Sequence, residues 1–221
     1  MFRNIPDVLT QAELAQLRAI AARTSFADGK LTAAGSPHKN NLQVADRAAH
    51  EQASQIVAQA LIRNEDFRVF AFPKTMMPPI LTRYDTGMSY GIHVDSAYMP
   101  VGARALRSDV SCTVFISDAS DYEGGELRIR LGTAEIDIKG KAGSAILYPS
   151  TSLHQVQPVT SGSRLIALTF IESRIANAEH REWLFELNDI AAIAGEKMDV
   201  ETYTRLQRVQ ENLLRYWGDP D

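Results

Sequence analysis

The 221-residue sequence has one cysteine, no long apolar stretch and no excess of basic charge, and each absence excludes a class of protein. The lone Cys112 rules out an intramolecular disulfide and fits a reducing compartment. No run approaches the roughly 20 apolar residues that span a bilayer, and the opening MFRNIPDVLT lacks the apolar region of a secretory signal. A net charge of −4 gives no electrostatic reason to expect nucleic acid or membrane as a partner. We therefore expect a cytoplasmic protein that binds neither.

Helical patterns occur near both ends of the chain. Thr10 and Glu13 form the sequence signature of a capping box, which predicts a helix over residues 11–23. Asp46 predicts the start of a second helix, and apolar residues at helical spacing predict two more over 180–193 and from 199 onward. Between the first two helices, residues 25–45 are expected to form an irregular connection. Its polar cluster, residues 38–41, is either a solvated loop or a rim that touches substrate, and we do not expect His38 to bind a metal.

The middle of the chain has the two-residue period of strands. Phe67, Val69 and Ala71 begin the alternation, and about eight short strands are expected from there to residue 172, with Gly124 and Gly125 forming a turn. Cys112 should be a small buried residue of one strand. Strands without intervening helices favour a sandwich or jelly roll. Because the predicted helices at both ends of the chain would pack on this β core, the fold class is α+β. We expect a catalytic part at 1–175 and a helical segment at 176–221 that belongs to the same globule and could mediate homo-oligomers.

Four residues form the pattern of a metal and anion site: His93, Asp95, His154 and Arg164. His93 and Asp95 are two apart in a predicted strand, so both side chains project from one face and can reach one ion. His154 follows a turn and opens another alternating run, which makes it the candidate third ligand. Two histidines and one carboxylate are the ligands of non-haem Fe(II) oxygenases. Arg164, ten residues after His154, predicts a guanidinium that holds a carboxylate in bidentate fashion.

Five stretches carry a resemblance to a known family: RYDTGMSYGIHVD, SCTVFIS, YEGGELRI, GSAILYPSTSLHQVQPVTSGSR and LFELN. With the spacing of the four site residues, they resemble the bacterial PKHD-type hydroxylases, 2-oxoglutarate-dependent dioxygenases of the prolyl 4-hydroxylase-like group. The resemblance runs nearly end to end. It implies a double-stranded β-helix, a cupin-like jelly roll, with the dioxygenase segment at about 78–174.

The resemblance also implies the chemistry of the site. His93, Asp95 and His154 would bind Fe(II), Arg164 would hold the cosubstrate 2-oxoglutarate, and O2 would be consumed, with ascorbate as a reductant. Tyr84 and Tyr148 could donate hydroxyls to the cosubstrate or serve only as core residues. Better-known prolyl hydroxylases use a further tyrosine on the SCTVFIS strand, and the corresponding residue is Phe115. Tyr90, three residues before His93, is expected on the opposite face of a regular strand and outside the site.

The substrate and two alternative functions stay open at this point. The substrate could be an amino acid, a peptidyl residue or a small metabolite such as an iron-chelating compound, entering past residues 85–90 and 96–108. A cupin-like metal enzyme that is not an oxygenase could use Zn(II) or Mn(II) with the same ligands. A non-enzymatic sensor of 2-oxo acids or iron could act through a partner. Arg164 favours the oxygenase, because a 2-oxoglutarate carboxylate explains its position.

Overall fold

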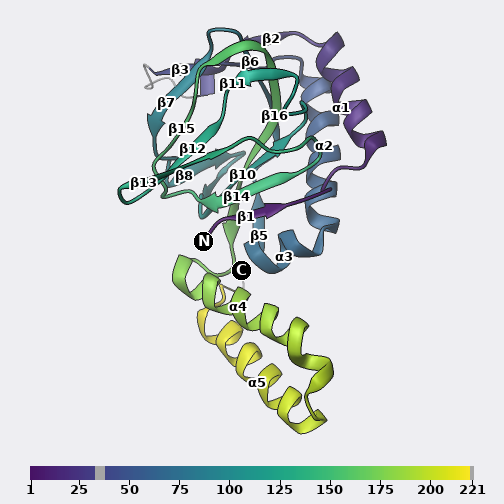
Figure 1. Cartoon of the computed structure of the whole chain (residues 1–221), viewed down its shortest axis with the longest axis vertical. Helices are drawn as coiled ribbons and strands as arrows, with labels where there is room; N and C mark the ends of the chain where they lie inside the picture. Colours follow the sequence, from purple (N-terminus) through teal and green to yellow (C-terminus); the bar gives the residue numbers. More distant parts are fainter. Residues whose placement is uncertain (33–37, 220–221) are drawn as a thin grey trace.

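The structure, a computed structural model, describes residues 1–32 and 38–219 and has two facing antiparallel sheets at its centre (Figure 1). The larger sheet has the order β1-β14-β10-β16-β6-β4-β2, and β5 and β11 also pair with β16. Its strands are β1 (Arg3–Ile5), β2 (Phe26–Asp28), β4 (Leu42–Val44), β5 (Pro73–Met76), β6 (Ile80–Asp85), β10 (Val110–Phe115), β11 (Tyr122–Gly124), β14 (Ala145–Pro149) and β16 (Val159–Ser173).

The smaller sheet has the order β13-β12-β15-β7-β3. Its strands are β3 (Lys39–Asn40), β7 (Ser89–His93), β12 (Leu127–Leu131), β13 (Ala134–Ile138) and β15 (His154–Val156). A separate hairpin, β8 (Tyr98–Val101) and β9 (Arg104–Arg107), follows β7. Helices α1 (Gln11–Arg23) and α2 (Arg47–Arg63) lie along one side of the β core (Figure 1). This arrangement confirms the predicted α+β jelly roll.

Strand β10 shows how the period of two divides the core, because all six of its residues are buried. Val110, Cys112 and Val114 belong to the apolar cluster shared with α1 and α2, whereas Phe115 belongs to the cluster between the two sheets. Cys112 is fully buried, as predicted, and burial raises the pKa of its thiol, so it is a packing residue. The second cluster borders the site described below.

Helix α1 begins as its sequence predicts. The Thr10 side chain accepts a hydrogen bond from the Glu13 amide, and the Glu13 carboxylate accepts one from the Thr10 amide at 2.8 Å, which completes the capping box. Arg63, at the end of α2, donates to both oxygens of Glu13 at 2.6 Å. These contacts lower the pKa of Glu13 from 4.5 to about 2, with the Arg63 hydrogen bonds as the main cause.

Replacing Glu13 with glutamine should lower the free energy of unfolding at pH 7 by about 1 kcal/mol, because glutamine keeps the capping-box acceptor but loses the charged pair with Arg63. Because the folded protein depresses the pKa of Glu13, this stabilisation is complete above pH 4.5 and disappears as the pH falls toward 2. Urea unfolding of both proteins over this range measures the difference. The control Glu51→Gln removes an exposed ion pair with Arg47 and should change stability by less than about 0.5 kcal/mol. A Glu13 effect that persisted at pH 2 would contradict the assignment.

The expectation of a strand beginning at Phe67 is wrong, because residues 65–71 form helix α3 (Glu65–Ala71). Asn64 caps this helix by accepting a hydrogen bond from the Phe67 amide at 2.9 Å. Phe67, Phe70 and Ala71 are buried at helical spacing. The apolar residues are so dense here that they satisfy the strand period of two and the helix period of 3.6. The Asn64 cap is the feature that favours the helix.

The segment 25–45 is more regular than expected. It contains β2, the 3-10 helix η1 (Gly29–Thr32), β3 and β4, although Gly35 and Pro37 lie outside the described residues. Between residues 73 and 173 the structure has twelve strands, where about eight were expected. The difference arises because strands of three to five residues joined by tight turns leave almost no alternating pattern; β8 and β9, joined through Gly102 in the left-handed region, are one such pair.

The C-terminal helices α4 (Ala178–Ala194) and α5 (Val200–Trp217) are confirmed, with the 3-10 helix η2 (Gly195–Lys197) between them. They form a hairpin that projects from the β core (Figure 1). Phe185 of α4 packs edge-on against Phe70 at 5.5 Å between ring centroids, and Lys74 pairs with Asp219 at 2.8 Å. The division of the chain near residue 175 stays a prediction. Among the described residues, no helix has the length and apolar character needed to cross a membrane.

Candidate metal and 2-oxoglutarate site

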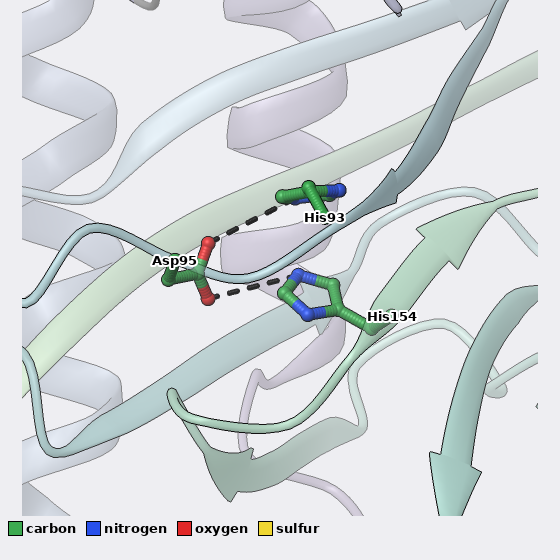
Figure 2. Close-up of side chains that lie close together, drawn as sticks. All are labelled: His93, Asp95 and His154. Carbon is green, nitrogen blue, oxygen red and sulfur yellow. Dashed lines mark ion pairs between the residues drawn. The ribbon is translucent and has the colours of Figure 1, made fainter.

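His93, Asp95 and His154 come together although they are 61 residues apart at the extremes. His93 ends β7 and pairs in register with His154 at the start of β15, and Asp95 follows β7. Figure 2 shows the two oxygens of the Asp95 carboxylate facing the two imidazoles. One oxygen is 3.9 Å from His93 Nε2 and the other is 3.6 Å from His154 Nε2. One ligand atom from each residue lies within 4.8 Å of the others. Atoms bound to one ion at about 2.1 Å lie roughly 3 to 3.5 Å apart, so a small contraction would place all three on a metal.

Both imidazoles have a backbone partner that fixes the ring. Nδ1 of His93 lies 2.8 Å from the Gly91 carbonyl, and Nδ1 of His154 lies 2.9 Å from the Ser152 carbonyl. A carbonyl only accepts, so each Nδ1 carries the proton and each Nε2 presents a lone pair toward Asp95. Burial, with His154 nearby, lowers the pKa of His93 to about 4. At neutral pH His93 is therefore uncharged, as an imidazole that binds a metal must be.

The Asp95 carboxylate is oriented from the larger sheet. Ser111 of β10 donates a hydrogen bond to Asp95 Oδ2 at 2.6 Å, and the Ser111 and Ser150 hydroxyls are 2.8 Å apart. Both serines are buried. Burial raises the pKa of Asp95, while His154 and the Ser111 hydrogen bond oppose that effect. Because Ser111 contacts the candidate ligand Asp95 and is not itself one of the three clustered residues, it would act as a positioning residue.

Replacing Ser111 with alanine should weaken metal binding about tenfold, since partners that orient a ligand cost about 10- to 100-fold when removed. Titration of Mn(II) into the protein, followed by electron paramagnetic resonance, measures the affinity. Ser144→Ala is the matched control, because Ser144 is also buried but donates to the Lys141 carbonyl away from the site. Ser111→Thr retains the hydroxyl and should recover part of the affinity. Equal Mn(II) affinity in the parent and in Ser111→Ala would contradict this role.

Arg164 lines one cavity together with His93, Asp95 and His154, and this cavity, bordered by strands of both sheets, has a volume of about 150 Å³. Its side chain is only 1% exposed, and its Nε and Nη1 atoms have no hydrogen-bond partner among the described residues. Its guanidinium carbon lies 5.2 Å from the Tyr84 ring centroid and 5.9 Å from that of Phe115. A buried guanidinium with unsatisfied donors is costly unless an anion joins it. The site therefore fits a dicarboxylate that reaches from the metal ligands to Arg164.

Tyr84 and Tyr148 both line this cavity and are buried. The Tyr84 hydroxyl accepts a hydrogen bond from Asn41 Nδ2 at 2.8 Å, which leaves its own proton to donate. The Tyr148 ring lies 5.0 Å from that of His154. Burial raises the pKa of both phenols, so both are protonated donors at neutral pH. Phe115, in place of the family tyrosine, offers only its ring to Arg164.

The expectation that Tyr90 lies outside the site is wrong. Its ring stacks on the His93 ring with centroids 3.7 Å apart, and it lines the cavity. His154 pairs with His93, but Val156 pairs with Tyr90, so three steps along β7 match two along β15. This irregularity puts Tyr90 and His93 on one face although they are an odd number of residues apart.

The sequence patterns also missed three residues near the site. Lys39 and Asn41, within the polar cluster 38–41, are buried rather than solvated, and Lys39 lines the cavity. Tyr122 is buried within the electrostatic influence of Arg164. Gly125 is the residue in the sequence that could have indicated Tyr122. A Cβ at Gly125 would lie 3.1 Å from both Arg164 Cδ and Tyr122 Cε2, so only glycine fits there. That glycine marks a close approach as well as a turn.

Comparison with known proteins identifies the class. Residues 79–172 match the model of the 2OG-Fe(II) oxygenase superfamily. A PKHD-type hydroxylase of Sphingopyxis alaskensis is 52% identical over 217 residues, covering 98% of this chain and 99% of the relative. A 2OG-Fe(II) oxygenase family oxidoreductase from Burkholderia pseudomallei has a TM-score of 0.60 at 15% identity and covers 77% of this chain and 85% of its own. A Pseudomonas putida prolyl-4-hydroxylase has a TM-score of 0.53 at 17% identity, with 78% and 92% covered.

The chain belongs to the PKHD-type hydroxylases within the 2OG-Fe(II) oxygenase superfamily. It is therefore a dioxygenase that uses Fe(II), 2-oxoglutarate and O2, and the resemblance seen in its sequence is confirmed. Membership decides against the two alternatives, a metal enzyme that is not an oxygenase and a sensor without catalysis. The three clustered residues that could hold a metal and the unsatisfied guanidinium are the features of this structure that fit such cofactors.

Proposed function

We propose that His93, Asp95 and His154 hold Fe(II), that Arg164 holds the distal carboxylate of 2-oxoglutarate, and that succinate and CO2 are released as the substrate is hydroxylated. The observation that supports this assignment is the buried Arg164 guanidinium with unsatisfied donors, in the same cavity as the three ligands. An isolated buried cation of this kind requires an anionic partner. Bound Fe(II), 2-oxoglutarate and O2 supply the oxidising power for hydroxylation, which no protein side chain provides.

Charge balance supports the same arrangement. Fe(II) with the Asp95 carboxylate has a net charge of +1, the 2-oxoglutarate dianion brings −2, and Arg164 returns the total to zero. A neutral total matters because uncompensated charge in a buried site is expensive. The imidazoles of His93 and His154 contribute no charge when they act as ligands. The four residues thus account for the cosubstrate without any further ion.

The remaining cavity residues position the cosubstrate and exclude water. Tyr84, next to Arg164, is the hydroxyl that we assign to the distal carboxylate in place of the tyrosine replaced by Phe115. Tyr148 has its ring beside that of His154 and is close enough to Tyr84 to feel its charge, so it would contact the same ligand. Apolar side chains cover much of the wall: Ile80, Leu127, Val156, Ile166 and Leu168. All these residues belong to 1–175, the part that we propose to be catalytic, while 176–221 adds the helical hairpin.

Decarboxylation of the cosubstrate tests this function directly. The Fe(II) protein is supplied with O2, ascorbate and 2-oxoglutarate labelled at the carboxylate next to the keto group. We expect labelled CO2 and succinate in equal amounts, slowly without substrate and faster when a small molecule or peptide serves as substrate. Ascorbate supplies the electrons for turnovers without substrate. Neither product forming under these conditions would overturn the proposal.

A further inference from the structure

Tyr84 and Arg164 are cross-strand neighbours at one wall of the cavity. Tyr84 on β6 pairs in register with Arg164 on β16, and the guanidinium carbon lies 5.2 Å from the centroid of the Tyr84 ring. Both side chains are buried and line the cavity. A guanidinium only donates hydrogen bonds, so Arg164 cannot accept the proton of the Tyr84 hydroxyl. An anion bound beside Arg164 can accept that proton when the hydroxyl is turned toward it.

Asn41 determines how the Tyr84 hydroxyl is turned. Its Nδ2 atom donates a hydrogen bond to the Tyr84 oxygen at 2.8 Å, and its side chain is 3% exposed. An N–H donor cannot accept a hydrogen bond, so the hydroxyl proton of Tyr84 points away from Asn41. Asn41 therefore holds Tyr84 as a donor whose proton is left for another acceptor.

Gly29 fixes which end of the Asn41 amide faces Tyr84. The Gly29 backbone amide donates to the Asn41 backbone carbonyl at 2.9 Å, and a Cβ at Gly29 would collide with Asn41 Oδ1. Gly29 thus turns a Cα–H toward Oδ1, a weak donor for an oxygen that has no other hydrogen-bond partner among the described residues. With the amide reversed, the two Nδ2 protons would face this C–H instead, and buried unpaired donors are costly. The nitrogen is therefore the end that faces Tyr84.

We propose that Asn41 is a positioning residue for 2-oxoglutarate, because it holds the Tyr84 hydroxyl as a donor to the distal carboxylate beside Arg164. This inference rests on the proposed function, which places that carboxylate at Arg164. Gly29 and Asn41 both precede residues 79–172, the part that matches the superfamily model. The connection between α1 and α2 therefore contributes to the cosubstrate subsite although it lies outside that part.

A double-mutant cycle between Asn41 and Tyr84 tests the inference. 2-Oxoglutarate is titrated into the anaerobic Fe(II) protein, and the metal-to-ligand absorption band gives its affinity. Asn41→Ala should weaken binding about two- to tenfold, the effect of one hydrogen bond. Tyr84→Phe should weaken it by a similar factor, and adding Asn41→Ala to Tyr84→Phe should weaken it no further. Iron affinity should stay the same throughout, because neither residue is a ligand.

Asn41→Asp preserves the shape of the side chain and covers the case in which alanine disturbs folding. Its carboxylate would accept the Tyr84 proton, so it should weaken 2-oxoglutarate binding more than alanine does. Most of that loss should vanish when Asn41→Asp is combined with Tyr84→Phe. Asn40→Asp, the same change at the exposed neighbour, is the matched control and should leave the affinity unchanged.

Two results overturn the inference. One is an Asn41 effect of the same size with and without the Tyr84 hydroxyl, and the other is unchanged 2-oxoglutarate affinity in both Asn41 variants. The proposed function fails instead when the parent forms no absorption band with 2-oxoglutarate, or when Arg164→Lys binds it as tightly as the parent. The two failures are distinguishable, because the second is observed in proteins that retain Asn41.

Discussion

Alanine at Asp95 is expected to abolish Fe(II)-dependent formation of succinate from 2-oxoglutarate. The Asp95 carboxylate faces both imidazoles and is the only acidic member of the three-residue cluster among the described residues. Removing a partner that merely orients a ligand costs about 10- to 100-fold, so removing the ligand should leave less than about one per cent of the activity. His93→Ala and His154→Ala should behave in the same way. Succinate formation and bound iron are measured on the same samples.

Folding should survive these changes, because the apolar clusters on both sides of β10 do not include the three ligands. Thermal unfolding without metal should therefore be similar in the parent and the variants, while only the parent should gain stability when metal is added. His50→Ala, on α2, is the control and should keep full activity and iron. His180, which stacks on Trp217, should also be dispensable for metal binding. Full activity in any of the three ligand variants, or iron loss in a His180 variant, would show that the ligand set is wrong.

Lysine at Arg164 is expected to weaken 2-oxoglutarate binding by about ten- to a hundredfold. The substitution keeps the positive charge but loses the planar fork that binds both oxygens of a carboxylate, and a charge-assisted pair of this kind contributes about 1.5 to 3 kcal/mol. Iron affinity should stay unchanged, because Arg164 is not a ligand. Titration of 2-oxoglutarate into the anaerobic Fe(II) protein, followed by the metal-to-ligand absorption band, measures both quantities.

Arg83→Lys is the matched control for this experiment. Arg83 belongs to β6, the neighbour of β16, but its side chain is partly exposed and pairs with Asp85 rather than lining the cavity. It should leave the titration unchanged. Unaltered 2-oxoglutarate affinity in Arg164→Lys would mean that another residue anchors the cosubstrate.

The sequence identified the residues whose types and spacing are fixed by chemistry. A metal needs particular donors, so His93, Asp95 and His154 could be selected before their positions in space were known, and the structure brings them together. Arg164 was likewise selected for its guanidinium, and it lies buried at the same cavity. The helix starts were predictable because a cap such as Thr10 or Asp46 acts locally.

Residues whose position depends on distant pairing were missed. Tyr90 reaches the site only because β7 and β15 pair irregularly, and nothing in the period of two announces that irregularity. Lys39 is buried because β3 pairs with the edge of β7. Its polar neighbours His38 and Asn40 suggested a solvated loop instead. The prediction of a strand beginning at Phe67 was wrong for a local reason, because a dense apolar run satisfies both the strand and the helix period.

The strands next to Arg164 and Asp95 are paired unequally, which implies that the backbone at these two residues differs in local stability. Arg164 lies on β16, where it is in register with Tyr84 of β6, and β16 also pairs with β10 over residues 166–171 and with β11 and β5 at its two ends. Asp95 lies beyond the end of β7, a strand of the smaller sheet with irregular pairing to β15. Segments with fewer backbone hydrogen bonds open more often than the centre of a sheet. The Asp95 amide hydrogen would thus exchange faster than that of Arg164, and a local opening at Asp95 would disturb the proposed metal site while the proposed 2-oxoglutarate anchor stays folded.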